Sequence, residues 1–415
     1  MDNSTEIKPA KQNRRTDSHQ DSEPTSDGLP GWLAMIFAVT CGISVANIYY
    51  AQPLLDAIAS DFALSPAKVG LVVTLTQVGY AVGLLLVVPL GDLVDRRKLI
   101  LSQTILSAVA LALVGLSPTA SILFVGMIAV GLLAVVVQVL VAFTASLATP
   151  SERGRAVGLV TSGVVAGILA ARSVSGLIAD LGGWRTVYLT SALLMILMAI
   201  ILSSALPRRH MIKSSDSYAG IVKSIPALFM HDQLFRQRAI FAFLIFASFS
   251  TLWTAMVLPL SSAPYLLSHT EIGLFGLAGL AGALAANAAG RLADRGYSQW
   301  TTGVSLALLI LSWLAIGLLS QSLAAFLGGV ILLDFAVQAV HVTNQSLIFA
   351  ARPDAHSRLV GGYMVFYSLG SAVGAIASTT IYASLGWGGV TILGGAFSAA
   401  GVLLWLFSLL RIKAK

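Results

Sequence analysis

Two ionisable side chains lie inside long apolar stretches of this chain. Arg172 interrupts "GVVAGILAARSVSGLIA" and Asp334 interrupts "GGVILLDFAVQAV". A carboxyl group in such surroundings can bind and release a proton, and a guanidinium can neutralise it. The sequence contains no H-E-x-x-H and no G-x-S-x-G, and its six histidines are scattered. We therefore expect ion pairing or proton transfer at these positions, and we expect neither an enzyme nor a metal site.

The segment around Asp334 carries further polar residues at helical spacing. Four side chains share one face because they follow one another at steps of four, three and four: Asp334, Gln338, His341 and Gln345. A polar stripe in an apolar helix should line a cavity, where Asp334 would take up a proton and His341 would be a second titrating group. Burial favours the neutral acid, whereas a nearby Arg172 favours the anion. The alternative is a buried polar network that only holds helices together.

The elements that must position these residues are membrane-spanning helices. The chain has 415 residues, 57% of them hydrophobic, against about 45–50% in soluble proteins. The apolar stretches lack the alternation of a β-barrel and are each near the roughly 20 residues that cross a bilayer as a helix. We therefore expect an all-α membrane protein with transmembrane helices at about 32–55, 67–90, 98–116, 120–147, 155–179, 186–206, 238–262, 272–290, 300–319, 322–350, 359–383 and 389–410.

The net charge of +7 is a topology signal. All but three of the 25 basic residues fall on one side of the predicted helices; the exceptions are Lys68, Arg185 and Arg172. This asymmetry is the positive-inside pattern, which places both termini in the cytoplasm and does not indicate a nucleic-acid partner. The single cysteine, Cys41, excludes an internal disulfide.

The polar segments divide the chain. Residues 1–30 are polar and read as a disordered cytoplasmic tail, and residues 207–237 form a cytoplasmic linker between two sets of six helices, 31–206 and 238–411. Within the linker, the apolar residues near 221–229 favour either a short helix on the inner membrane surface or a loose connection.

The two halves share short sequences in the same order. "GDLVDR" at 91–96 matches "GRLADR" at 290–295, and "TPSERGRAVG" at 149–158 matches "RPDAHSRLVG" at 352–361. Repeated six-helix units build transporters whose site lies near the midplane between the halves, and rocking of one half against the other exposes that site to each side in turn. The expected fold is thus two six-helix bundles related by a pseudo-two-fold axis.

These features resemble the major facilitator superfamily over residues 31–411. The first motif copy lacks the family's second glycine, and the second copy is nearer the family pattern with Gly290, Asp294, Arg295 and Gly296. "ANIYYAQPLLDAIASDF" and "ERGRAVGLVTSGVVAGILAARSVSG" are similar to the bacterial branch that exports drugs, sugars or nucleosides in exchange for protons. The resemblance implies a bacterial cytoplasmic (inner) membrane location, alternating access, and a proton gradient in place of any cofactor.

The motif copies are the predicted gating motif. By the family's pattern, the Asp95 carboxylate would dock on the positive N-terminus of the helix at 359–383 and close the cytoplasmic side, while Gly91 would permit close helix approach. The neighbouring bases would pair with acids of the motif or with lipid phosphates. Topology alone is the other explanation. The predicted gating residues are Gly91, Asp92, Asp95, Arg96, Arg97, Gly290, Asp294 and Arg295.

The central site is predicted between the halves. Arg172 and Asp334 lie about 12 Å and about 18 Å from the outer ends of their helices, so we expect an ion pair across the cleft that is made in one conformation and broken in another, unless each finds a partner in its own half. Proton exchangers of the family commonly carry an arginine at the position of Met127, which this chain lacks. The remaining cavity residues are chosen because polar groups facing lipid would be unsatisfied, or, for Trp253, as an apolar contact for substrate: Asn47, Tyr49, Tyr50, Gln52, Gln77, Gln138, Trp253, Gln338 and Gln345. The two tyrosines could equally belong to the interfacial aromatic belt, and Trp253 to helix packing.

The predicted function is export of a small neutral or cationic organic solute by a monomeric transporter in exchange for protons. Few fixed charges lie in the predicted cavity, which disfavours a polyanion. Uptake or facilitated diffusion of a sugar or another metabolite is the alternative, and a channel is disfavoured because the repeated halves indicate alternating access.

Overall fold

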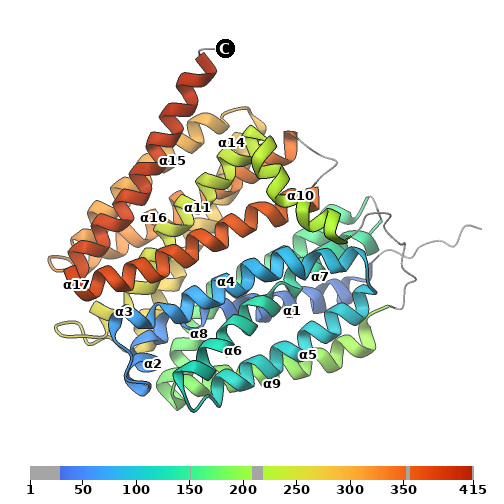
Figure 1. Cartoon of the computed structure of the whole chain (residues 1–415), viewed down its shortest axis with the longest axis horizontal. Coiled ribbons are helices and arrows are strands. Elements are labelled where there is room, and N and C mark those ends of the chain that lie inside the picture. The colour runs from blue at the N-terminus through green and yellow to red at the C-terminus, as the bar shows by residue number, and fades with distance from the viewer. Residues whose placement is uncertain (1–28, 150, 208–217, 352–355, 414–415) are drawn as a thin grey trace, which may run out of the picture.

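The computed structural model describes residues 29–149, 151–207, 218–351 and 356–413, and helices are the regular secondary structure of these ranges (Figure 1). The first half contains α1 (Gly31–Tyr49), η1 (Gln52–Leu54), α2 (Leu55–Asp61), α3 (Pro66–Val69), α4 (Leu71–Leu86), η2 (Val88–Asp92), α5 (Arg96–Gly115), α6 (Ala120–Ala134), α7 (Val136–Leu147), α8 (Arg153–Gly182) and α9 (Trp184–Ala205). The rest contains α10 (Tyr218–His231), α11 (Gln233–Ala255), α12 (Val257–Leu260), α13 (His269–Leu274), η3 (Phe275–Ala278), α14 (Gly279–Asp294), α15 (Ser298–Gly317), α16 (Leu323–Ala351) and α17 (His356–Lys413).

The helices make the twelve crossings that the sequence predicts. Eleven stretches of the described ranges are long and apolar enough to cross a membrane, and the last, Leu359–Leu410, has 52 residues. A single crossing takes about 20 residues, so this stretch is long enough for two. Gly386 divides it because its backbone is left-handed, with φ 62°, a conformation that breaks the helix and suits glycine.

Equivalent helix pairs hold each half together. In the first half α1 packs against α8, and a side chain at Gly163 or Gly167 would collide with the α1 backbone. In the second half α11 packs against α17, and a side chain at Gly370 or Gly374 would collide with the α11 backbone. The two halves therefore repeat the same glycine-dependent packing, four residues apart, as expected for related bundles.

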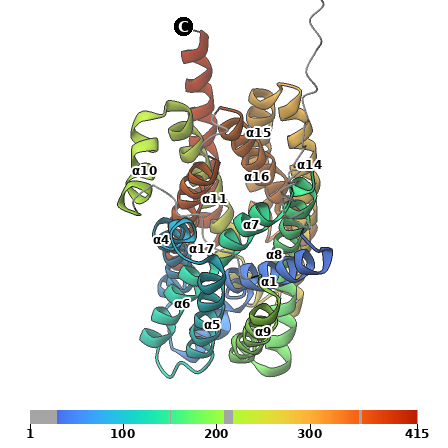
Figure 2. The same cartoon turned by 90° about the vertical axis from the view of Figure 1, so that its right-hand side faces the viewer.

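The halves meet at one end of the molecule. Most of the described contacts between them join α8 to α13 and η3 and join α4 and α3 to α17, and smaller ones join η1 and α2 to α11, α12 and α13. There the Thr74 hydroxyl donates to the Ala372 carbonyl at 3.0 Å, and the Ser173 hydroxyl donates to the Gly273 carbonyl at 3.0 Å. We call this the closed end. In Figure 2, α5, α6 and α9 of the first half lie below α14, α15 and α16 of the second.

The linker contains a helix, and its predicted place on the inner membrane surface stays a prediction. Helix α10 is joined to the first half by the Tyr218 hydroxyl, which donates to the Leu86 carbonyl at 2.8 Å. Its other end packs on the second half, where the ring of Phe229 stacks on Phe366 with centroids 4.7 Å apart. Residues 208–217, and residues 1–28 of the predicted tail, lie outside the described residues.

Candidate functional site

Arg172 is buried where the two halves meet. Its side chain is 2% exposed on α8, and its Nε donates to Gln52 Oε1 at 2.7 Å. Gln52 begins η1, a turn of 3-10 helix after α1, where Pro53 cannot donate a backbone hydrogen bond and so breaks the α-helical pattern. The break presents the Gln52 amide to the guanidinium. A buried charge is costly unless polar groups satisfy it, and Arg172 Nη2 is left without a partner here.

Trp253 connects Arg172 to Asp334. The Arg172 guanidinium lies over the Trp253 ring, 3.8 Å from its centre, and the indole Nε1 donates to Asp334 Oδ1 at 3.1 Å. The ion pairs between described residues do not include Arg172 with Asp334, so this conformation is not the one in which the predicted pair would be made, and the pair stays a prediction. The indole occupies the space between the two charges and offers its face to the cation and its N–H to the carboxylate.

A tyrosine pair extends the contact between the halves. The hydroxyls of Tyr49 on α1 and Tyr367 on α17 are 2.5 Å apart, and the Tyr49 ring centre is 5.1 Å from the Arg172 guanidinium. All six residues of this assembly are at least 91% buried. We call it the central cluster: Tyr49, Gln52, Arg172, Trp253, Asp334 and Tyr367.

Glycines of α13 to α14 make room for the cluster. A Cβ at Gly276 would lie 3.1 Å from the Arg172 Cβ, and one at Gly282 would lie 2.9 Å from the Gln338 Cγ. Both distances are shorter than ordinary side-chain contacts. Larger residues would push α8 and α16 away from this span and would displace the cluster.

His341 belongs to a second polar network. Its Nδ1 is 3.0 Å from the Tyr363 hydroxyl, which also accepts from Asn344 Nδ2 at 3.5 Å. Asn344 Oδ1 in turn accepts from Arg238 Nη1 at 3.3 Å. Asp334 and His341 share a helix, as predicted, but their described hydrogen-bond partners differ. In the sequence, Arg238 is one of many basic residues that indicate the cytoplasmic side. In the structure its side chain is buried, with 1% exposed.

The other predicted cavity residues are buried or half-buried but do not join the central cluster. Asn47 Oδ1 accepts from the Ser191 hydroxyl at 2.6 Å, and Gln138 Nε2 donates to the Tyr80 hydroxyl at 3.3 Å. Gln77 Oε1 is buried without a partner. Gln338 and Gln345 are half-buried. Tyr50, like Tyr49, is buried inside the protein, so the interfacial-belt alternative is wrong for both.

The first copy of the gating motif, residues 91–97, makes its described contacts within the first half. The Asp95 carboxylate accepts from the Arg97 backbone N–H at 2.9 Å and caps α5. Arg96 Nε donates to the Gly91 carbonyl at 2.8 Å, and Arg97 Nη2 donates to the Ser203 carbonyl at 2.6 Å. Docking of Asp95 on α17 therefore stays a prediction for another conformation.

The motif glycines are not required by packing in this conformation. A Cβ at Gly91 would meet its nearest neighbour, Val139 Cγ1, at 3.7 Å, and one at Gly290 would meet nothing within 4 Å. The expected close helix approach at Gly91 is therefore wrong here. Arg295 is exposed at the end of α14. The side chains of Asp92 and Asp294 lie outside those that the structure describes.

Comparison with known proteins identifies the family. The family model for the Major Facilitator Superfamily matches residues 34–258 and 238–415. The chain belongs to the major facilitator superfamily. It is 44% identical over 373 residues to the putative uncharacterized transporter YgaY of Escherichia coli (strain K12), covering 90% of this chain and 94% of that protein. It is 32% identical over 384 residues to the probable transporter SCO4007 of Streptomyces coelicolor, covering 91% of this chain and 89% of that protein.

Solved structures agree on the fold of this superfamily member. A bacterial homologue of the human lysosomal transporter Spinster, crystallised in an inward-facing and unoccupied conformation, superposes with a TM-score of 0.72 at 15% identity over 93% of this chain and 96% of that one. The human organic anion transporter MFSD10 superposes with a TM-score of 0.68 at 18% identity over 91% of this chain and 100% of that one. The chain is thus a multi-pass membrane transporter with the two-bundle fold of its superfamily.

Several residues of the central cluster and of the second polar network around His341 are not predicted from the sequence. Asn344 follows His341 by three residues, so helical spacing could have added it to the stripe. Tyr363 and Tyr367 are four residues apart, but they read as ordinary aromatic residues of an apolar helix. Nothing local distinguishes them, because their partners lie on other helices.

Proposed function

We propose that this transporter exports a small neutral or cationic organic solute in exchange for protons, with Asp334 as the proton-carrying carboxyl group. The observation that carries the proposal is the position of Asp334: a carboxylate 3% exposed, hydrogen-bonded to Trp253, beside a cation of the other half. Ionisable residues buried in membrane spans mark transport pathways and proton relays. The proton gradient is the energy source, and the basic side of the molecule faces the cytoplasm of a bacterial inner membrane.

The central cluster supports a coupling step in which protonation changes what holds the halves together. When Asp334 is ionised, it accepts the Trp253 N–H and attracts Arg172, which is stacked on the same indole. Protonation removes that attraction and weakens the contact between Arg172 of the first half and Trp253 of the second. The halves can then exchange partners, as alternating access requires.

The aromatic rings around Arg172 support a neutral or cationic solute. The guanidinium lies within 3.8 Å, 5.1 Å and 5.7 Å of the ring centres of Trp253, Tyr49 and Phe249. The faces of these rings attract cations, and their surfaces are apolar. A positively charged or uncharged aromatic solute would therefore compete with Arg172 for the Trp253 face and would gain the Asp334 carboxylate if it is a cation.

The test is transport by purified protein in liposomes with an imposed pH gradient, screened over dyes, antibiotics, nucleosides and sugars. For a transported solute, we expect wild-type protein to accumulate it against its gradient. Asp334→Asn should keep downhill exchange of labelled for unlabelled solute but lose pH-driven accumulation.

The matched control is Asp61→Asn, because Asp61 is a partly exposed carboxylate in an ion pair within the first half. It should retain pH-driven accumulation. Undiminished pH-driven accumulation by Asp334→Asn would reject Asp334 as the proton carrier.

A further inference from the structure

A single histidine joins the two halves at the closed end. His269 is the first residue of α13, in the second half, and its ring nitrogens face two carboxylates of the first half. Nδ1 is 2.8 Å from Asp180 Oδ1 at the end of α8, and Nε2 is 3.2 Å from Asp56 Oδ1 on α2. No part of the central cluster takes part in these contacts.

Both contacts of His269 can be hydrogen bonds only if the group of three side chains holds one extra proton. An ionised carboxylate only accepts hydrogen bonds, and a neutral imidazole carries one N–H and one lone pair. A neutral ring between two carboxylates would therefore turn its lone pair toward one of them. Both contacts are satisfied if the ring is imidazolium, or if one aspartate is protonated and donates to a neutral ring. Each solution holds one proton more than the neutral ring with two carboxylates.

We propose that His269, Asp56 and Asp180 form a second proton-binding site, whose proton holds the closed end of the transporter shut. The inference rests on the alternating movement in the proposed function, but not on Asp334 or on the identity of the solute. When the site loses its proton, the contact between His269 and Asp56 becomes a repulsion of acceptors, and the halves separate more readily at this end.

The surrounding contacts assign the two carboxylates different tasks. Asp180 also accepts from the backbone N–H groups of His269 and Thr270 and from the Thr270 hydroxyl, at 3.2, 2.8 and 2.6 Å. These donors hold Asp180 on α13 whatever the state of the imidazole. The described hydrogen bond of Asp56 is the one to His269, and it is longer than the Asp180 contact, at 3.2 Å against 2.8 Å. We assign the N–H of a neutral ring to Nδ1 and the shorter contact, so the Asp56 contact is the one that the proton decides.

Protons can reach the site from the surface. The His269, Asp56 and Asp180 side chains are 24%, 26% and 28% exposed. Glu271, the other ionisable group of α13, accepts from the Ser268 backbone N–H and caps the helix start. The elements η1 and η3, which pack against α13, contain no ionisable side chain, and Arg172 of α8 is turned toward Gln52. Among the described residues, no group of three His, Cys, Asp or Glu could hold a metal ion.

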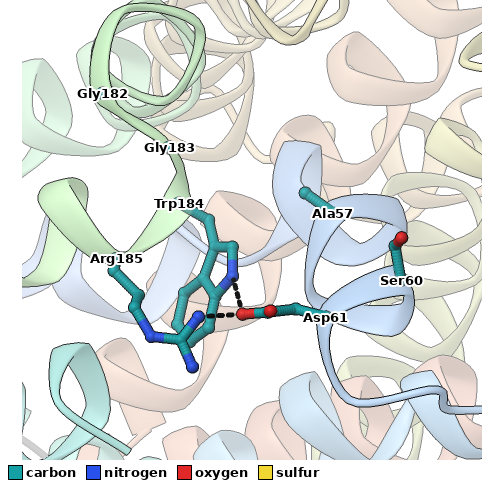
Figure 3. A pocket seen from close by; sticks show the side chains of 7 residues that line it. All are labelled: Ala57, Ser60, Asp61, Gly182, Gly183, Trp184 and Arg185. Carbon is teal, nitrogen blue, oxygen red and sulfur yellow. Dashed lines mark hydrogen bonds and ion pairs between the residues drawn. The ribbon is translucent and has the colours of Figure 1, made fainter.

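A neighbouring ion pair at the same end provides a control. Asp61 accepts from both Arg185 and the Trp184 indole, and these residues line a cavity of about 410 Å³ (Figure 3). All three residues belong to the first half. Breaking this pair changes charge and packing near the closed end without touching a contact between the halves.

The test measures opening of the closed end with no solute and no gradient. Leu116 and Leu385 are exposed residues, one from each half. Leu116 precedes Ser117, whose carbonyl accepts from Arg185, and Leu385 follows Thr379, which lies against Gly70 of the first half. Each is replaced by cysteine and spin-labelled after Cys41→Ala removes the native cysteine, and distances are measured in lipid nanodiscs at about pH 5 and about pH 9, either side of the usual histidine range. We expect the short-distance population of the wild type to fall about tenfold at the higher pH, which corresponds to about 1.4 kcal/mol.

Two variants separate a proton site from a structural contact. His269→Gln should give the same distances at both pH values. Asp56→Asn should stay closed at both, because its amide can donate to the neutral Nε2 and replaces the proton. Asp61→Asn should respond to pH as the wild type does.

A wild-type distance distribution that ignores pH would overturn the proposal, as would an unchanged pH response in His269→Gln or in Asp56→Asn. Asp334→Asn in the same assay should keep the pH response. Rejection of Asp334 as the proton carrier in the liposome experiment therefore does not reject the proton-binding site at His269. Rejection of the His269 site likewise does not reject Asp334.

Discussion

Arg172 and Asp334 approach each other from opposite halves and are held apart by one indole ring. The ring face of Trp253 lies 3.8 Å from the guanidinium, and its N–H donates to the carboxylate at 3.1 Å. A direct ion pair would neutralise both charges and resist separation. An intervening aromatic ring keeps them near each other while leaving the carboxylate able to take up a proton.

Two replacements of Trp253 should distinguish the effect of its ring contact with Arg172 from the effect of its hydrogen bond to Asp334. Trp253→Phe keeps a ring for Arg172 but removes the N–H, so Asp334 loses the described hydrogen bond and its ionised form is destabilised. Leaving a buried acceptor unpaired costs about 1–3 kcal/mol, which predicts a change of about 5- to 150-fold in pH-driven transport. We expect the optimum of the pH–transport profile to move toward higher pH, because the carboxyl group then holds its proton more tightly.

Trp253→Leu removes both contacts and should lose pH-driven transport further. The measurement is the initial rate against pH, with the amount of folded protein checked by thermal unfolding. Equal profiles for Trp253→Phe and the wild type would contradict the role of the indole N–H.

Arg172 should not be replaceable by lysine. The guanidinium stacks on Trp253 and at the same time donates from Nε to Gln52 Oε1. An ammonium group is compact and strongly hydrated, and it cannot stack as a plane while donating sideways. We therefore expect Arg172→Lys to lower transport at least about tenfold with the folded protein still present.

Arg185→Lys is the control for this exchange, because Arg185 is 36% exposed and its ion pair with Asp61 lies at the surface. Exposed pairs contribute about 0–1 kcal/mol. Both variants are compared by solute flux per folded molecule. Similar fluxes for Arg172→Lys and Arg185→Lys would show that only the positive charge matters at position 172.

The fold follows from the sequence because the bilayer imposes it. Long apolar stretches must be helices to satisfy their own backbone, and their number, the polar linker and the repeated motifs indicate two six-helix units. The break within the first membrane span is harder to predict from the sequence. The structure divides this span into α1, η1 and α2, with the break at Gln52–Leu54. Pro53 hints at that break, but nothing in the sequence says that it presents Gln52 to a residue 120 positions away.

Only part of the candidate site can be predicted from the sequence, because the partners of its residues lie far away along the chain. Charges in apolar segments stand out, so Arg172 and Asp334 are found, and their shared location between the halves follows from their depths. Trp253 is predicted as a cavity residue, but as an apolar contact for substrate or as packing, and nothing in the sequence places its ring between the two charges. His269 and Asp56 are 213 positions apart and lie at helix ends, where ionisable residues are ordinary.

The tyrosine pair should behave as one unit. Tyr49→Phe or Tyr367→Phe leaves the other hydroxyl buried without its 2.5 Å partner, while the rings stay in place. Each single change should destabilise the conformation with the closed end shut, relative to the open one, by about 1–3 kcal/mol. The double change should destabilise it by less than the sum of the two single changes. The spin-label distances used for the closed end measure this equilibrium. Strictly additive effects would mean that the hydroxyls do not interact.

The repeated glycine packing predicts equivalent losses of stability in both halves. A methyl group at Gly163 would collide with the Ala38 backbone, and one at Gly370 would collide with the Phe243 backbone. Gly163→Ala and Gly370→Ala must therefore separate α1 from α8 and α11 from α17, which should cost about 1–3 kcal/mol each.

Gly361→Ala is the matched control, because a methyl group there meets nothing within 4 Å and alanine favours a helix by about 1 kcal/mol. Thermal unfolding in detergent should show lower midpoints for Gly163→Ala and Gly370→Ala and an unchanged or higher midpoint for Gly361→Ala. A drop confined to one half would mean that the two bundles share their fold but not the packing that holds it.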